Sequence, residues 1–90
     1  MNNSKYAVVV TFSFDPQVSV LLFDTHEAAM EFIKKDIDEE HHEDLVNEFD
    51  SEMTIYESEN RAVLITHGES EDLITEWTIG TVYDHEEVKE

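Results

Sequence analysis

The sequence predicts an α+β domain: an antiparallel sheet of about five strands, in the order β-β-α-β-β-β, with one main helix on one face. Two observations support this expectation. Five segments are rich in β-branched and aromatic residues with an alternating pattern, and one segment between the second and third has helical periodicity. A length of 90 residues with 40% apolar side chains allows one modest core, so residues 1–90 are expected to form a single domain.

The first two strands are expected to form a hairpin. Tyr6–Phe14 alternates between a strongly apolar face and a half-polar one, and Val18–Phe23 has similar composition. The turn is expected at Asp15–Gln17, because the ring of Pro16 presets the backbone angle that the second residue of a turn requires. The two strands are therefore predicted to pair in antiparallel fashion.

The helix is expected to begin after this hairpin. Asp24 is the expected N-cap, with Glu27 completing a capping box three residues later, and Thr25 is the competing cap. One apolar stripe recurs at i, i+3, i+4 and i+8. It consists of Ala29, Phe32, Ile33 and Ile37.

The end of the helix is harder to place, because no glycine or proline marks a stop. Eight acidic residues between Asp36 and Asp50 repel one another and weaken an isolated helix. The sequence favours a helix to about residue 40, followed by a bend or a second short helix to about residue 49. Leu45, Val46 and Phe49 are then expected to hold this second part from beneath.

Three strands are expected in the remainder of the chain. They are Met53–Glu57, Arg61–His67 and Leu73–Tyr83, separated by a turn at Ser58–Asn60 and a polar loop at Gly68–Asp72. Gly80 inside the last strand suggests a bulge or a close backbone approach. The charged tail from residue 84 to 90 is expected to be frayed.

One helix can cover only one face of such a sheet. The core between helix and sheet is expected to contain Val10, Phe12, Phe32, Ile33, Ile37 and Trp77. The opposite face also carries apolar residues at alternate positions, so it requires a cover. Either the acidic segment wraps around the sheet, or a second subunit covers it in a homodimer.

The most unusual stretch is residues 36–52, DIDEEHHEDLVNEFDSE, in which nine of seventeen residues are acidic. The whole chain has 23 acidic against 5 basic side chains, a net charge of −18. Direct contact with nucleic-acid phosphates or with an anionic membrane surface is therefore not expected. The acids are too numerous to be neutralised internally, so they must face water or a basic partner.

Other classes of protein lack support in the sequence. The chain has no cysteine, which excludes disulfides, thiol nucleophiles and thiolate zinc sites. The first residues, MNNSKY, lack the pattern of a signal peptide, and no apolar run approaches the roughly 20 residues of a membrane span. A cytoplasmic protein is expected.

No enzymatic or metal-binding motif is recognisable, so the sequence predicts a non-enzymatic protein with no cofactor, no catalytic residue and no metal site. No serine lies in a G-x-S-x-G context, and two glycines cannot make a phosphate loop. The adjacent His41 and His42 point about 100° apart on a helix, so they cannot share one ion as an i, i+4 pair would. Asp38 and His42 have that spacing. Binding of a divalent cation at a weak site there is the third candidate function, after the two described below.

Two interpretations of the acidic segment remain open. It is either a solvated face that keeps the protein soluble, or a surface that imitates a nucleic-acid backbone. One carboxylate in every two residues of a helix gives a charge about every 3 Å along the axis, close to the phosphate spacing of a single strand, about 3.4 Å. Such a face fits the basic groove of a protein that binds DNA or RNA.

Small size, extreme acidity, the absence of cysteine and the α+β pattern are similar to the DNA-mimic proteins of phages and mobile elements. That class includes antirestriction proteins, anti-CRISPR inhibitors and the uracil-DNA glycosylase inhibitor. The resemblance implies a protein that binds and inhibits or regulates a basic nucleic-acid-binding protein, such as a nuclease, a CRISPR effector or a repressor. The alternative is a dimeric accessory or structural protein of a phage or mobile element, in which charge serves only solubility.

The residues expected to contact the partner are acidic and fall into two groups. The first group lies in the acidic segment and consists of Asp36, Asp38, Glu39, Glu40, Glu43, Asp44 and Glu48. The second is expected to form a patch on the loops and consists of Glu57, Glu59, Glu69, Glu71 and Asp72.

Overall fold

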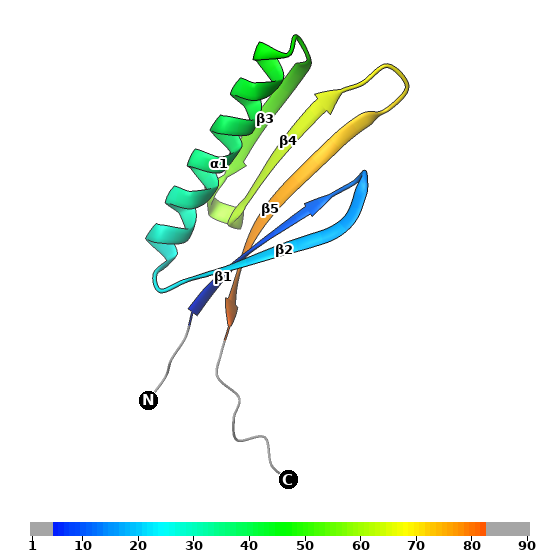
Figure 1. Cartoon of the computed structure of the whole chain (residues 1–90). Coiled ribbons are helices and arrows are strands. Elements are labelled where there is room, and N and C mark those ends of the chain that lie inside the picture. Colours follow the sequence, from blue (N-terminus) through cyan, green and yellow to red (C-terminus); the bar gives the residue numbers. More distant parts are fainter. Residues whose placement is uncertain (1–4, 83–90) are drawn as a thin grey trace, which may run out of the picture.

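The structure is a computed structural model that describes residues 5–82, and it confirms the predicted order of elements (Figure 1). Five strands and one long helix make up an α+β fold, with a short 3-10 helix between two of the strands. In chain order they are β1 (Lys5–Phe12), β2 (Asp15–Phe23), α1 (His26–Val46), β3 (Asp50–Tyr56), η1 (Glu57–Glu59), β4 (Arg61–His67) and β5 (Asp72–Val82).

The five strands form one antiparallel sheet in the order β2-β1-β5-β4-β3. The strands β1, β5 and β4 are paired along both edges, and β2 and β3 are the edge strands. Val10 on β1 lies opposite Trp77 on β5. The helix α1 packs on one face, mainly against β3 and β4 (Figure 1). The other face carries no helix within residues 5–82.

The first turn was predicted in the wrong place. The hairpin turns at Ser13 and Phe14, and Asp15 already pairs with Phe12 after a register shift. Pro16 therefore lies within β2, where its missing N–H is tolerated because β2 is an edge strand. The backbone N–H of Ser13 donates to the carbonyl of Ile74 at 2.8 Å, which ties the turn to β5.

The helix begins with the competing cap, not with Asp24. The hydroxyl of Thr25 accepts a hydrogen bond from the backbone N–H of Ala28 at 3.1 Å. This register puts Ala28 at the N3 position, so Glu27 cannot complete a capping box. Asp24 instead forms an ion pair with Lys5 at 2.6 Å, which lowers the pKa of its carboxyl.

The predicted break near residue 40 is absent, because α1 continues without interruption to Val46. The proposed apolar support was also wrong, since Leu45, Val46 and Phe49 are all more than half exposed. The second half of the helix is held by polar contacts with the sheet. Its carboxylates at Asp36 and Asp44 both accept hydrogen bonds from strand residues.

The helix ends in a Schellman motif around Asn47. The backbone N–H of Phe49 donates to the carbonyl of Asp44 at 2.8 Å, and that of Glu48 donates to Leu45 at 3.0 Å. This geometry requires a left-handed backbone at Glu48, whose φ is 67°. A residue with a Cβ is strained in that region, and glycine is the residue most often found there.

Glu48→Gly is therefore expected to raise the free energy of unfolding by roughly 0.5–1 kcal/mol, because relief of strain outweighs the added freedom of the unfolded chain. Chemical denaturation measures the change. Glu48→Gln removes the same charge but keeps the Cβ, so it serves as the control and is expected to change little. Equal stabilisation by both variants would assign the gain to charge instead of backbone strain.

The predicted core is largely confirmed. Val10, Ile33, Ile37 and Trp77 are at most 6% exposed, and Phe12 and Phe32 pack against them half-buried. The stripe residue Ala29 is fully buried as well. The helix face and the sheet face were thus assigned correctly from periodicity alone.

Two details of the last strands differ from expectation. β3 begins at Asp50, not at Met53, because residues 50–52 pair with residues 65–67 of β4. Gly80 makes neither a bulge nor a close approach: it stays in register opposite Ala7, and a Cβ placed on it would meet open space. The predicted end of the last strand at Tyr83, and the tail 84–90, lie outside the described residues.

Candidate functional site

The outward face of α1 presents exposed carboxylates that form no ion pair within the described residues. Asp38, Glu39 and Glu43 are exposed, and Glu39 and Glu43 are one helical turn apart. Within residues 5–82, no lysine, arginine or histidine forms an ion pair with any acidic residue between Asp36 and Glu48. The negative charge of this face is therefore open to solvent and to a partner.

Two other acids of the helix face the sheet. Asp36 is half-buried and accepts a hydrogen bond of 2.9 Å from the indole N–H of Trp77, which needs a partner because the ring is buried. Asp44 accepts a hydrogen bond of 2.7 Å from the hydroxyl of Thr66. Both carboxylates therefore anchor the helix to the sheet, whatever further contacts they make.

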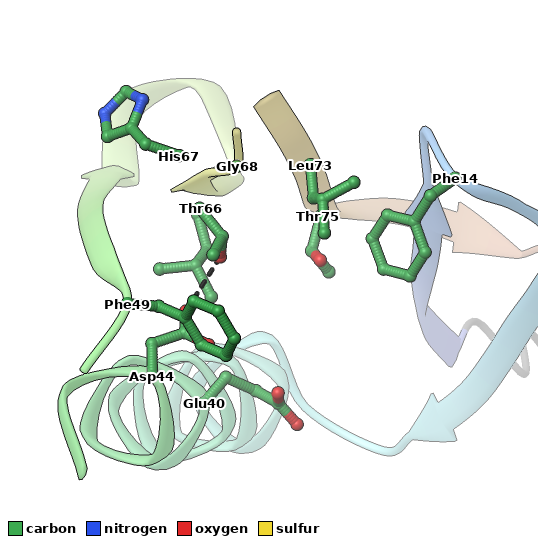
Figure 2. A pocket seen from close by; sticks show the side chains of 10 residues that line it. Phe14, Glu40, Asp44, Phe49, Thr66, His67, Gly68, Leu73 and Thr75 are labelled. Carbon is green, nitrogen blue, oxygen red and sulfur yellow. Dashed lines mark hydrogen bonds between the residues drawn. The ribbon is translucent and has the colours of Figure 1, made fainter. Parts of the chain in front are cut away.

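Between these two anchors, Glu40 borders a groove between α1 and the sheet. Figure 2 shows Glu40 and Asp44 on the helix side of one hollow, with Leu73 and Thr75 of β5 and Phe14 of the β1–β2 turn on the other side. This hollow has a volume of about 180 Å³, and it shares Thr75 and Glu40 with a second hollow of about 210 Å³. The second is lined by side chains of β1, β2, β5 and α1, among them Phe12 and Trp77.

The groove changes the electrostatics of Glu40. Its pKa is raised, first because the walls of the groove remove water from the carboxyl, and second because Asp36, Glu43, Asp44 and Glu39 are close. Both causes disfavour the ionised carboxylate, and an incoming cation would relieve them. The groove thus combines apolar walls with a carboxylate that a positively charged group would stabilise.

The acids predicted to form a patch on the loops lie apart. Glu57 and Glu59 are in η1, before β4, whereas Glu69 and Glu71 lie in the loop after β4. The seven residues of β4 separate the two sets by roughly 20 Å. Asp72 begins β5 next to the second set. These residues therefore do not make one surface.

Several of these acids also have partners in the domain. Glu57 pairs with Lys34, which lowers the pKa of its carboxyl. Glu59 lies 3.8 Å from Arg61. Glu48 is exposed in the turn that ends the helix. Of the predicted contact acids without an ion pair among residues 5–82, six therefore lie on α1 and three, Glu48, Glu69 and Glu71, lie outside it.

The histidines of the acidic segment point in different directions, as their spacing predicts. His41 makes a hydrogen bond of 2.8 Å between its Nδ1 and the hydroxyl of the buried Ser51. His42 is exposed beside Glu39 and Glu43. In the part of the chain that the structure describes, no three histidine, aspartate or glutamate side chains are placed to hold a metal ion.

Sequence reasoning missed a charged cluster around His67. Its Nε2 lies 2.9 Å from Glu52 and its Nδ1 lies 3.0 Å from Asp72. Hydrogen bonds to these two carboxylates raise the pKa of His67 to about 9. Strand pairing could have revealed the cluster, because Asp72 lies directly opposite His67 on β5, and Glu52 lies on the same face of β3, two residues from the position opposite His67.

The pKa of His67 predicts a pH dependence of stability. Its pKa is higher in the folded state than the 6.5 of the free side chain, so the ion pairs stabilise fully below about pH 6.5. This stabilisation is lost as the pH rises through about 9. The difference in unfolding free energy between the wild type and His67→Gln should therefore shrink over that interval. A difference independent of pH would contradict the assignment.

Comparisons of the chain with protein-family models, with curated proteins and with solved structures return no match. The only long helix among residues 5–82, α1, is too polar to cross a lipid bilayer.

Proposed function

We propose that the chain is a non-enzymatic, cytoplasmic acidic protein that binds a basic protein handling nucleic acid, and so inhibits or regulates it. The observation that carries the proposal is the outward face of α1, where Asp38, Glu39 and Glu43 are exposed with no cation paired to them. A protein keeps such a concentration of like charge at a cost in stability, which a basic partner offsets.

The continuity of α1 supports a nucleic-acid-like spacing of this charge. Because the helix runs unbroken to Val46, its exposed acids Asp38, Glu39, Glu40 and Glu43 follow one helix axis. At 1.5 Å per residue they recur roughly every 2–3 Å along it, near the phosphate spacing of a nucleic-acid strand. A continuous helix keeps this spacing between the carboxylates, whereas two short helices joined by a bend would not.

The groove beside Glu40 gives such a partner a place to anchor. An arginine or lysine side chain has an apolar stem and a cationic head. The stem fits between apolar side chains such as Phe14 and Leu73, and the head would meet Glu40, whose pKa is raised by burial and by the neighbouring carboxylates. Arginine in a desolvated pocket is a frequent energetic hot spot of protein interfaces. The class of partner that fits best is thus a nuclease, a CRISPR effector or a repressor with a basic binding groove.

A second candidate is a dimeric accessory or structural protein of a phage or mobile element, in which the charge serves solubility. It is favoured by the apolar sheet face that α1 leaves open. The two candidates differ in salt response, because charge-mediated binding weakens steeply with salt and apolar contact does not.

The experiment is capture of partners from a cell lysate on the immobilised protein, followed by competition. The proposal expects a basic nucleic-acid-binding protein that elutes between about 0.05 and 0.2 M salt and that added double-stranded DNA or RNA displaces. A captured partner that neither salt nor nucleic acid releases would contradict the proposal.

A further inference from the structure

The sheet face opposite α1 is apolar along its β2 side. Val18, Val20 and Leu22 are 57%, 59% and 58% exposed, and they alternate with Leu21 and Phe23, which pack into the core. Neighbouring strands continue this apolar surface toward the middle of the sheet. On β1, Val9 lies opposite Val20 of β2. On β5, Ile74 and Val82 are 37% and 42% exposed.

The β4–β3 side of the same face is charged but almost neutral. Arg61 donates to Glu76 at 2.6 Å, and His67 bonds both Glu52 and Asp72. By strand alternation, three groups that carry positive charge lie on this face against four carboxylates. The cations are Lys5, Arg61 and protonated His67, and the acids are Asp50, Glu52, Asp72 and Glu76. Lys5 lies at the β1 end of the face and is paired with Asp24, so the face with this partner included carries a net charge of about −2.

This near neutrality contrasts with the whole chain, which has 23 acidic and 5 basic residues. Two copies of a molecule with a net charge of −18 repel each other wherever acids face acids. The open sheet face is a broad surface on which two copies can meet with little of that repulsion. It also carries six of the exposed large apolar side chains, namely Val18, Val20, Leu22, Tyr56, Ile74 and Val82. The charge pattern therefore selects a second copy of this chain over an acidic partner.

The available area agrees with a dimer of moderate affinity. Five strands about 4.8 Å apart and about seven residues long cover on the order of 550 Å². Two such faces bury about 1,100 Å², above the roughly 1,000 Å² expected of a specific interface but at the low end of the range.

We propose that the open sheet face is a self-association surface, on which two copies pack sheet against sheet around a twofold axis. The apolar strip of β2, β1 and β5 forms the centre of the contact, the β4–β3 side of the face completes it, and the two α1 helices lie on the outer sides. Three layers of about 10 Å separate the helices by about 30 Å, well beyond the Debye length of about 8 Å, so their charges repel little at physiological salt. If the function proposed above holds, such a dimer offers two acidic faces to basic partners and gains avidity.

The test measures self-association alone, so its outcome does not depend on any partner. Sedimentation of the full chain at about 50 µM and about 0.15 M salt is expected to show a dimer, strengthened modestly by added salt. The double variant Val20→Lys/Leu22→Lys should be a monomer, because it places charge in the apolar contact. Its matched control is Leu45→Lys/Val46→Lys, which makes the same change at exposed sites of α1 and should remain a dimer.

A monomeric wild type under these conditions would overturn the proposal, and so would equal association of the two double variants. Should the lysines on β2 prevent folding, Val20→Thr/Leu22→Thr keeps residues suited to a strand and should still weaken association at least tenfold. Amide exchange distinguishes another mode of assembly. Protection on dimerisation of the β2 amides that point away from β1 would show edge-to-edge pairing and contradict face packing.

Discussion

Ile33→Ala is expected to lower the free energy of unfolding by about 2–5 kcal/mol, a large part of the total stability of a 90-residue domain. Ile33 is fully buried at the centre of the core, where α1 meets the sheet. The shorter side chain loses burial and leaves a cavity that the five-stranded sheet cannot readily close. Urea unfolding followed by circular dichroism measures the loss.

Val46→Ala is the matched control, because it also shortens an aliphatic residue of the same helix. Val46 is 65% exposed, so its truncation should change the stability by less than about 0.5 kcal/mol. A loss below 1 kcal/mol for Ile33→Ala would show that α1 packs on the sheet through a different face.

The fold could be predicted because its signals are local and periodic. Alternation in Arg61–His67 predicted β4 with both of its ends correct, and the stripe through Ile33 and Ile37 identified the buried face of α1. These patterns depend only on which side of an element faces the core. The order of strands within the sheet carries no such local signal, and it came from the structure.

The wrong predictions of the helix break and of the first turn have a common physical cause. Polar contacts between residues far apart in the sequence determine both features. Repulsion among the acids suggested a break in the helix, but Trp77 and Thr66 on the sheet bind Asp36 and Asp44 and keep α1 continuous. The turn at Ser13 was likewise determined by its contact with β5. Contacts of this kind join residues 22 to 61 positions apart, and sequence periodicity does not report them.

The candidate site was only partly visible in the sequence. The acidic segment is evident from composition, but composition does not show which of its acids face outward. Asp38 and Glu39 point to solvent, Asp36 and Asp44 bond the sheet, and Glu40 borders the groove. The orientation of α1 about its own axis, relative to the sheet, decides which acids face outward, and only the structure gives it.

The proposed binding face predicts a large effect of local charge reversal. The triple variant Asp38→Lys, Glu39→Lys and Glu43→Lys places three cations on the outward face of α1. Binding to a basic partner should weaken on the order of 100-fold or more, because like charges then face each other across the interface. The fold should remain intact or become slightly more stable, because these side chains are exposed and repel one another.

The most direct test is the dissociation constant of the captured partner for this triple variant and for a matched control. The control reverses Glu86, Glu87 and Glu90, which lie outside the described residues and change the net charge equally. Calorimetry at physiological salt should show binding lost in the helix variant and almost unchanged in the control. Equal losses in the two variants would mean that bulk charge, and not the face of α1, binds the partner.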